Sequence, residues 1–418
     1  MKPEKLAIHG GPKAKTVPYG TGMRFGKEEL AQLEEALNQN TLFYWSGRSD
    51  KVVSFTKKFA EMYGMPYCIP TSSGTASLHV ALGALGIGPG DEVITSPITD
   101  AGTYIGILFQ QAIPVFADLD PHTYNMTAET IAARITPRTK AMIVVHLAGN
   151  PCDMDPIMEL ARKHNIKVIE DCAQSYNCYY KGRLVGTIGD IGCFSTNDFK
   201  HISTGDGGMV LTGDEDLYRR AFGFADKNYT RLRDKPLGRA AECLAPNYRM
   251  TELQGAVGLA QLDKLNDITE KRNKWGDGLT VGISGLPGIH PHRVEEGNKS
   301  SYWFYMFRVD PDELGCSRDE FVEALVAEGL PASPGYIPQC VYRIPMFVNQ
   351  TAYTKTNLPF VSEHYDGEVD YHEGLCPVAE QILLDAIRLP VNEFFTEQDL
   401  EETIAAIRKV WTWYQGQK

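Results

Sequence analysis

The chain has 418 residues, 43% of them hydrophobic and 22% charged, which indicates a folded globular protein large enough for two domains. Its net charge of −12 argues against a surface for nucleic acid or for anionic membranes. It has no apolar run of the roughly 18 residues that a membrane-spanning helix needs, its polar start lacks the pattern of a signal peptide, and its nine cysteines form no CxxC pair, so we expect a cytoplasmic protein with reduced thiols.

Residues 1–28 contain two glycine-rich turns and predict an arm that packs on another part of the protein. Apolar residues at helical spacing then predict one helix over residues 28–37 and a second over residues 52–63. A different pattern, in which short apolar runs alternate with helical stretches, begins at residue 67.

The alternating part of the chain predicts an α/β fold. The expected strands cover residues 67–70, 92–96, 114–118, 141–147, 167–169, 191–194 and 209–211. The expected helices between them cover residues 76–85, 101–110, 126–135 and 156–164. This order predicts a mostly parallel, doubly wound sheet of about seven strands, in which ligands bind at the carboxyl ends of the strands.

The C-terminal part of the chain predicts a smaller α+β domain. A long helix starts at Thr251 and continues toward Lys274, followed by a strand over 302–309 and by helices over 318–328 and 397–413, the last of which Thr396 caps. Residues 340–375 show little periodicity and predict a long surface or pocket-covering loop. The expected divisions are an N-terminal arm (1–28), a large domain (29–265) and a small domain (266–418).

Three separate stretches carry groups that together suit pyridoxal phosphate. Lys200 lies in a turn between two expected strands and supplies the amine that this cofactor binds covalently. Asp171 closes an apolar strand, where a protonated pyridine nitrogen would be a good partner for its carboxylate. Gly74 and Thr75 open a helix after a strand, and with Ser195 they form an expected phosphate site.

Each of these groups also has an ordinary structural explanation. A lone lysine is usually a solvated loop residue, and Asp171 alone would be read as a helix cap or a solvated strand end. Strand–turn–helix connections often contain glycine and serine without binding anything. The cofactor interpretation depends on all of the groups occurring together in the expected strand and turn contexts.

The chain resembles the DegT/DnrJ/StrS family of pyridoxal-phosphate-dependent sugar and cyclitol aminotransferases over nearly its whole length. The matching stretches are residues 72–79, 86–93, 145–151, 170–175, 181–183, 195–208, 247–254, 376–381 and 387–391. The resemblance implies the aspartate-aminotransferase fold (fold type I) with a seven-stranded sheet in the cofactor domain.

The resemblance assigns roles to individual residues. Lys200 matches the family's covalent lysine and Asp171 the carboxylate on the pyridine nitrogen. Gln174 matches the group near the ring hydroxyl. The residues matching the phosphate site are Gly74, Thr75 and Ser195. Asn247 matches an asparagine that reaches the phosphate from a second subunit, which implies a homodimer with shared active sites.

The implied reaction moves an amino group from glutamate or glutamine to a keto-sugar or keto-cyclitol. A basic loop with Arg231, Arg233 and Arg239 offers charges for a donor carboxylate or a nucleotide-sugar phosphate, and a solvated loop is its alternative reading. The opening at Leu6–Gly11 resembles the inosose branch of the family.

Other members use the same cofactor to dehydrate or epimerise sugars, and a non-catalytic regulatory relative is the alternative outside enzymes. Relatives that dehydrate carry histidine in place of the lysine; here His201 follows Lys200, and the spacing to Gly205 places the lysine in the site.

Three positions depart from the family pattern. Asp100 stands where an aromatic residue often stacks on the cofactor, Ala148 where tyrosine is common, and Asp206 where glutamate is usual. No metal site is expected, because His290 and His292 have no further ligand at suitable spacing.

Overall fold

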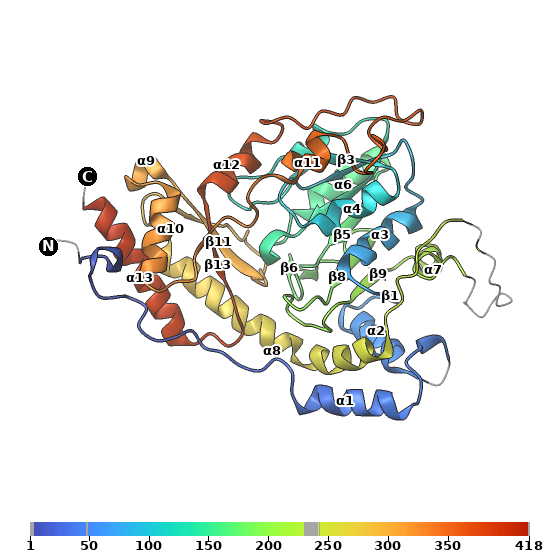
Figure 1. The fold of residues 1–418 in the computed structure, drawn as a ribbon, viewed down its shortest axis with the longest axis horizontal. Coiled ribbons are helices and arrows are strands. Elements are labelled where there is room, and N and C mark those ends of the chain that lie inside the picture. Colours follow the sequence, from blue (N-terminus) through green and yellow to red (C-terminus); the bar gives the residue numbers. More distant parts are fainter. Residues whose placement is uncertain (1–3, 47–48, 230–240, 242, 417–418) are drawn as a thin grey trace.

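The computed structural model of the protein describes residues 4–46, 49–229, 241 and 243–416 (Figure 1). Its larger sheet has seven strands in the order β1-β9-β8-β5-β4-β2-β3. The strands are β1 (Tyr67–Thr71), β2 (Glu92–Thr95), β3 (Ile113–Phe116), β4 (Thr139–Val145), β5 (Lys167–Asp171), β8 (Ile191–Ser195) and β9 (Gly208–Thr212). Only β9 is antiparallel to its neighbours, so the predicted mostly parallel sheet is confirmed.

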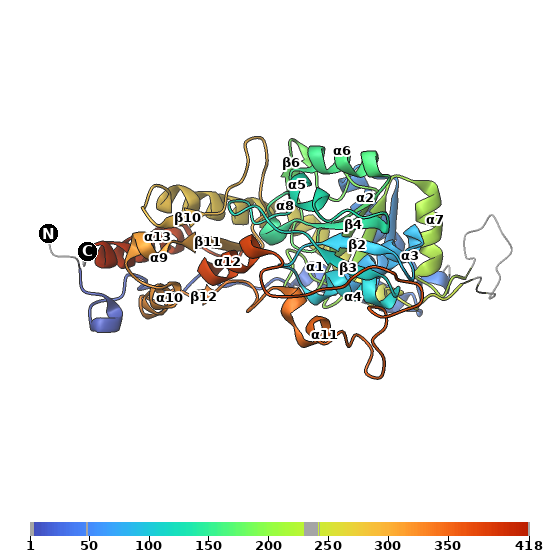
Figure 2. The ribbon, with the colours of Figure 1, turned by 90° about the horizontal axis from the view of Figure 1, so that it is seen from above.

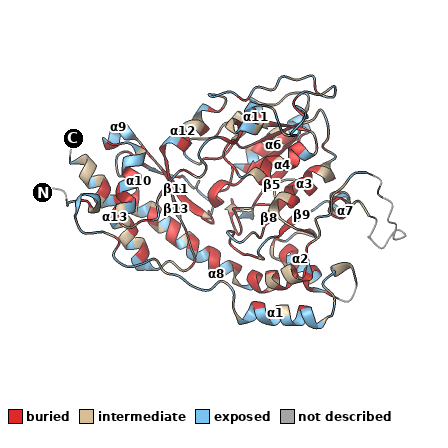
Figure 3. Cartoon of the chain, viewed as in Figure 1, coloured by how far each residue is buried: buried red, intermediate tan, exposed pale blue. Residues whose placement is uncertain are grey.

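Helices follow most of the strands and bury the sheet. They are α2 (Lys51–Met62), α3 (Gly74–Leu85), α4 (Ala101–Phe109), α5 (Ala128–Ala132), α6 (Met154–His164) and α7 (Glu215–Phe224), of which α7 was not predicted. The central strands are buried on both faces, which explains why their sequences are nearly continuous apolar runs (Figure 3). Short elements complete this part: β6 (Tyr179–Tyr180), β7 (Arg183–Leu184), η2 (Tyr44–Ser46) and η3 (Leu147–Gly149).

A single helix, α8 (Glu252–Ile283), runs along the molecule from α1 (Lys27–Asn38) and α2 to the C-terminal elements (Figures 1 and 2). Thr251 starts it through a capping box with Gln254. Close packing needs glycine here: a β-carbon at Gly258 would lie 2.6 Å from the Phe55 ring of α2. The helix passes through residue 266, where the sequence analysis divides the two domains.

The C-terminal elements form a second, antiparallel sheet of four strands with its own apolar core. Its strands, in spatial order, are β10 (Ile289–Pro291), β11 (Phe304–Val309), β13 (Ala386–Pro390) and β12 (Ser333–Pro334). Its helices are α9 (Pro311–Leu314), α10 (Arg318–Ala327), α12 (Pro377–Asp385) and α13 (Glu397–Gln415). The predicted cap at Thr396 is confirmed, since its side chain accepts from the N–H of Asp399.

The N-terminal arm, which includes η1 (Ala7–His9), packs on this second core. Leu6 is fully buried in it, and the Lys15 ammonium lies 2.8 Å from the Asp399 carboxylate of α13. The N-terminal arm and helix α13 therefore lie together at one end of the molecule (Figure 1).

Residues 340–375, predicted as a long surface or pocket-covering loop, are partly buried in the core, and several of residues 365–375 line a pocket beside β3. They include η4 (Val341–Arg343) and α11 (Pro345–Val348), and Phe347, Phe360 and Tyr371 are buried in the core beside edge strand β3. Tyr371 donates a hydrogen bond to the carbonyl of Pro114 in the region of β3, at 2.7 Å. Aromatic residues without periodicity can thus fill a core.

Among the described residues, no helix combines the length and the apolar character needed to cross a membrane.

Candidate active site

A cavity of about 230 Å³ lies at the carboxyl ends of β5 and β8, beside the first turns of α3 and α4. Six of the residues singled out by the sequence line it: Gly74, Thr75, Asp171, Gln174, Ser195 and Lys200. They come from three elements and two loops, and the sheet brings them together because parallel strands end at one edge. The cavity is where the sequence predicts a ligand.

Lys200 is buried, with 9% of its surface exposed, in the turn after β8. Its ammonium makes no ion pair within the described residues and lies over the indole ring of Trp303, 3.9 Å from the ring centre. Burial lowers the pKa of Lys200, and the nearby charges of Asp171 and Asp100 oppose that shift. A larger share of neutral amine results, which is the form that attacks a carbonyl or accepts a proton.

Asp171 ends β5 and is 5% exposed. Its carboxylate accepts a hydrogen bond from the hydroxyl of Thr103 at 2.8 Å and another from the N–H of Ala173 at 3.1 Å. Burial raises the pKa of Asp171, and these two donors and Lys200 counteract the rise. The sequence analysis missed Thr103, which is 68 residues away in the chain and shares the cavity through α4.

The start of α3 presents hydrogen-bond donors at the cavity. Ser73 caps the helix by accepting from the N–H of Ala76 at 3.0 Å, while the N–H groups of Gly74 and Thr75 have no intrahelical acceptor. A β-carbon at Gly74 would lie only 2.5 Å from Cβ of Ser195, so glycine is needed for α3 to begin this close to the end of β8. The Ser195 hydroxyl joins the same edge of the cavity.

These groups fit pyridoxal phosphate by their donor chemistry. The buried Asp171 carboxylate has hydrogen-bond donors but no cation in contact among the described residues, and a protonated ring nitrogen would provide one. A phosphate suits the start of α3 with its serine and threonine hydroxyls. Lys200 supplies the amine between them.

Within the cavity, both polar groups of the Gln174 side chain already have partners. The Gln174 carbonyl accepts from the N–H of Ala148 at 2.8 Å, and its amide nitrogen faces the hydroxyl of Tyr336 at 3.4 Å. Asn247 is exposed and does not line the cavity of its own chain. Arg231, Arg233 and Arg239 lie outside the described residues.

Asp100, the departure from the family pattern, lines the cavity as the cap of α4, where its carboxylate accepts from the N–H of Gly102 at 2.9 Å. It therefore places a negative charge near Lys200 and Asp171. His201 lies away from the cavity, fully buried, with its Nε2 2.9 Å from the carbonyl of Ser301.

A second cavity, of about 430 Å³, adjoins the first at Lys200, Asp100 and Asn197. Its further lining includes Trp303 and three arginines that the sequence analysis did not assign: Arg24, Arg272 and Arg388. Arg24 donates to the carbonyls of Lys200 and His201, so the N-terminal arm holds the lysine turn. Arg388 lies in one of the stretches that resemble the family, residues 387–391, but no local pattern assigns any of these four residues to the site, since only tertiary packing brings them to Lys200.

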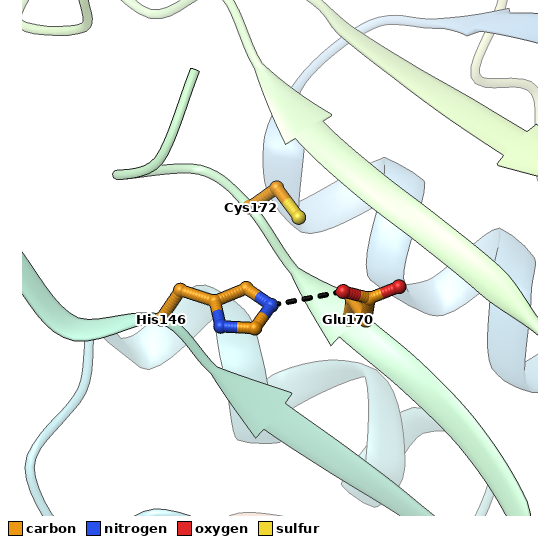
Figure 4. Close-up of side chains that lie close together, drawn as sticks. All are labelled: His146, Glu170 and Cys172. Carbon is orange, nitrogen blue, oxygen red and sulfur yellow. Dashed lines mark hydrogen bonds and ion pairs between the residues drawn. The ribbon is translucent and has the colours of Figure 1, made fainter. Parts of the chain in front are cut away.

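A buried cluster joins His146, Glu170 and Cys172, the last two of which flank Asp171 in the chain (Figure 4). The His146 ring and the Glu170 carboxylate are 3.0 Å apart, and Glu170 also accepts from the N–H groups of Gly186, Ile188 and Gly189. These bonds already satisfy the carboxylate, so the cluster fixes the loop that leads into β8. Burial raises the pKa of Cys172, as expected for a packing thiol.

Comparison with known proteins identifies what this chain is similar to. The model of the DegT/DnrJ/EryC1/StrS aminotransferase family matches residues 24–408. GDP-perosamine synthase of Caulobacter vibrioides is 34% identical over 366 residues, covering 86% of this chain and 90% of the relative. L-glutamine:2-deoxy-scyllo-inosose aminotransferase of Micromonospora echinospora is 35% identical over 344 residues, covering 79% and 81%. The X-ray structure of an aminotransferase from Psychrobacter cryohalolentis superposes with a TM-score of 0.83 at 33% identity, covering 94% of this chain and 99% of that one.

Proposed function

Because this chain belongs to the DegT/DnrJ/EryC1/StrS aminotransferase family, whose members depend on pyridoxal phosphate, we propose that it moves an amino group from glutamate or glutamine to a ketone on a sugar or cyclitol. Family membership makes the protein a pyridoxal-phosphate-dependent sugar or cyclitol aminotransferase. The choice of donor and acceptor, and the role of each residue, are our proposals.

The observation that carries the proposal is the presence of Lys200, Asp171 and the start of α3 around one cavity. In this reading, Gly74, Thr75 and Ser195 hold the phosphate and Asp171 pairs with the ring nitrogen. When bound, the cofactor supplies an electron sink that allows a C–H bond next to the amine to break. Gln174 lies on the same wall as Asp171, where it would bond the ring hydroxyl.

Lys200 then moves the proton. Its lowered pKa leaves Nζ able to take the proton from the donor carbon and to return it elsewhere. His201 has no access to the cavity, because its ring is buried and bonded to Ser301. This arrangement favours amine transfer over the dehydration that relatives with histidine in place of the lysine carry out.

Absorbance of the purified protein tests the proposal. We expect the band of the lysine-bound cofactor, and its conversion to the band of the aminated cofactor on addition of glutamate or glutamine. Lys200→Ala should lose both the covalent band and turnover, while Lys299→Ala, away from the cavity, should retain both. A band that neither donor changes would contradict amine transfer from these donors, and analysis of the products separates amination from dehydration.

A further inference from the structure

The indole of Trp303 contacts the lysine turn at two points. Its Nε1–H donates to the carbonyl of Phe199, the residue before Lys200, at 2.7 Å. The face of the same ring lies under the Lys200 ammonium, which is 3.9 Å from the ring centre. A cation within about 6 Å of an aromatic ring centre is attracted to the ring face, so the two groups are in direct contact. A ring that only filled the cavity wall would need neither contact.

Other parts of the protein hold Trp303 in this orientation. Its backbone N–H donates to the carbonyl of Ala148 at 2.9 Å, which fixes the chain where it enters β11. Its ring packs edge-on against the ring of Tyr336, with centres 5.7 Å apart, and contacts the ring of Phe304, with centres 5.2 Å apart. The position of the indole therefore does not depend on the lysine side chain.

The ammonium has no carboxylate in contact. Lys200 is buried, and within the residues that the structure describes its Nζ forms no ion pair. Asp171 of β5 and Asp100 of α4 raise the pKa of Lys200 through their charges from a longer distance. The other charged residues that line the two cavities are Asp198, Asp206, Arg24, Arg272 and Arg388. The indole face is thus the direct partner of the ammonium.

We propose that Trp303 is a positioning residue that holds the Lys200 ammonium at the junction of the two cavities whenever the lysine is not bound to the cofactor. In the proposed function, on which this inference rests, the amino donor displaces Lys200, and Nζ then takes a proton from the donor carbon. Nζ becomes an ammonium in that step, and the indole face stabilises the ammonium relative to the neutral amine. Trp303 therefore strengthens the base and keeps it beside the donor.

Fluorinated tryptophans at position 303 test the contact, because fluorine withdraws electrons from the ring face while the ring keeps nearly the same shape. The measurement is the pH dependence of Lys200 labelling by an amine-reactive reagent. It is made in cofactor-free protein and in protein loaded with the aminated cofactor, where the lysine is also free. The pKa of Lys200 should fall as one, two and four fluorine atoms are added. With four, labelling at neutral pH should be roughly 3- to 10-fold faster.

The midpoint of the pH dependence separates this effect from a change in access, which would alter labelling equally at every pH. Trp303→Leu, which removes the ring face, should lower the midpoint at least as far as four fluorine atoms do. Trp303→Phe should keep part of the effect, since its smaller ring still presents a face.

Trp411 is the matched control position. It is also half buried, and its Nε1–H also donates to a carbonyl, that of Pro287 at 2.9 Å, but it lies on α13 and lines neither cavity. The same fluorinated residues at position 411 should leave the labelling of Lys200 unchanged.

Single turnovers of the holoenzyme test the link to the reaction. With L-glutamine or L-glutamate, conversion of the cofactor band should slow roughly 2- to 10-fold as fluorine is added at position 303, because a weaker base takes the proton less readily. The apparent dissociation constant of the donor should stay nearly the same, since no bond to the donor is removed.

Four results would overturn the inference. The labelling midpoint could stay constant as fluorine is added, position 411 could shift it as much, or it could shift with no change in the single-turnover rate. Fluorination could also weaken only the binding of the sugar or cyclitol, as expected if the ring merely stacks on the substrate. Failure of the proposed function is distinguishable: no amino donor would convert the wild-type cofactor band, while the labelling midpoint would still move with fluorination.

Discussion

The charge of Asp100 acts on Lys200 through the cavity that both residues line. Three influences set the pKa of Lys200: burial lowers it, and the carboxylates of Asp171 and Asp100 raise it. An aromatic residue, which the family resemblance leads us to expect at this position, would not supply the second carboxylate. Asp100, in place of an aromatic residue, therefore raises the pKa of the Lys200 amine through its charge.

We predict that Asp100→Asn lowers the pKa of Lys200 further, because it removes one of the two charges that raise it. Asparagine is also a good helix cap, so α4 should keep its stability. The measurement is the pH dependence of Lys200 labelling by an amine-reactive reagent in cofactor-free protein, read by peptide mass spectrometry.

Asp198→Asn is the control for this shift. Asp198 lines the second cavity, but its carboxylate accepts from the Ser203 hydroxyl at 2.9 Å and is not among the charges that shift the pKa of Lys200. An unchanged pKa of Lys200 in Asp100→Asn would show that the Asp100 carboxylate is too well solvated to act on the amine. A higher pKa of Lys200 would contradict the prediction.

Much of the candidate site could be predicted from the sequence, because its backbone parts leave local signals. A lysine between two apolar strands, an acid at a strand end and a glycine at a helix start are visible in order along the chain. Thr103 and Trp303 leave no such signal. Each reaches the site through packing between elements that lie far apart in the chain, and strand alternation alone does not say which cavity a side chain faces.

At the scale of elements, a buried cluster of charges fastens the N-terminal arm to α13. The Lys15 ammonium lies 2.8 Å from Asp399 and 2.9 Å from Glu402. Burial alone would raise the pKa of Asp399, but hydrogen bonds from Lys15, Thr396 and Gly20 lower it to about 2. The pKa of Glu402 is also lowered to about 2, chiefly by Lys15.

We predict that Lys15→Met destabilises the protein by about 3 kcal/mol at pH 7, because it leaves the buried Asp399 carboxylate without its cation. Both carboxylates have lowered pKa values in the folded state, so the ion pairs stabilise the fold fully above a pH of about 4 and lose this effect as the pH falls toward 2. The difference in melting temperature between wild type and variant should accordingly shrink between pH 5 and pH 2.5, as measured by calorimetry.

Lys274→Met provides the comparison. Lys274 of α8 pairs with Glu397 of α13 at 2.7 Å, but both side chains are exposed. The variant's melting temperature should stay close to that of the wild type, because exposed ion pairs contribute little. An equal loss in both variants would contradict a special role for the buried cluster. The sequence predicted the arm and the helix, but a contact across 384 residues has no local signal.

At the scale of the molecule, α8 joins two sheets, and the candidate site opens where they meet. Lys200 follows a strand of the large sheet, while Arg388 lies on β13 of the small sheet. The fold class could be predicted because apolar runs and helical stretches alternate along the chain. The order of the strands in the sheet could not, because it depends on contacts between segments that are far apart in the sequence.

Two large apolar side chains that lie close in sequence to Lys200 and Asn247 are exposed. Phe199, next to Lys200, is 77% exposed, and Leu244, three residues before Asn247, is 95% exposed. Large exposed apolar side chains are typical of surfaces that another protein covers. We propose a homodimer in which Asn247 reaches the phosphate site of the other subunit, since in its own chain it does not line the cavity.

Mixed dimers test this arrangement directly. Lys200→Ala and Asn247→Ala should each be inactive or nearly so as homodimers. In a mixed dimer with shared sites, one site carries both substitutions and the other carries neither, so a randomly assembled equal mixture should regain about a quarter of the wild-type activity. If Asn247 served its own subunit, each site of the mixed dimer would carry one substitution and no activity would return. Sedimentation of the wild type provides the independent measurement, because a monomer that is fully active would contradict both the dimer and the shared site.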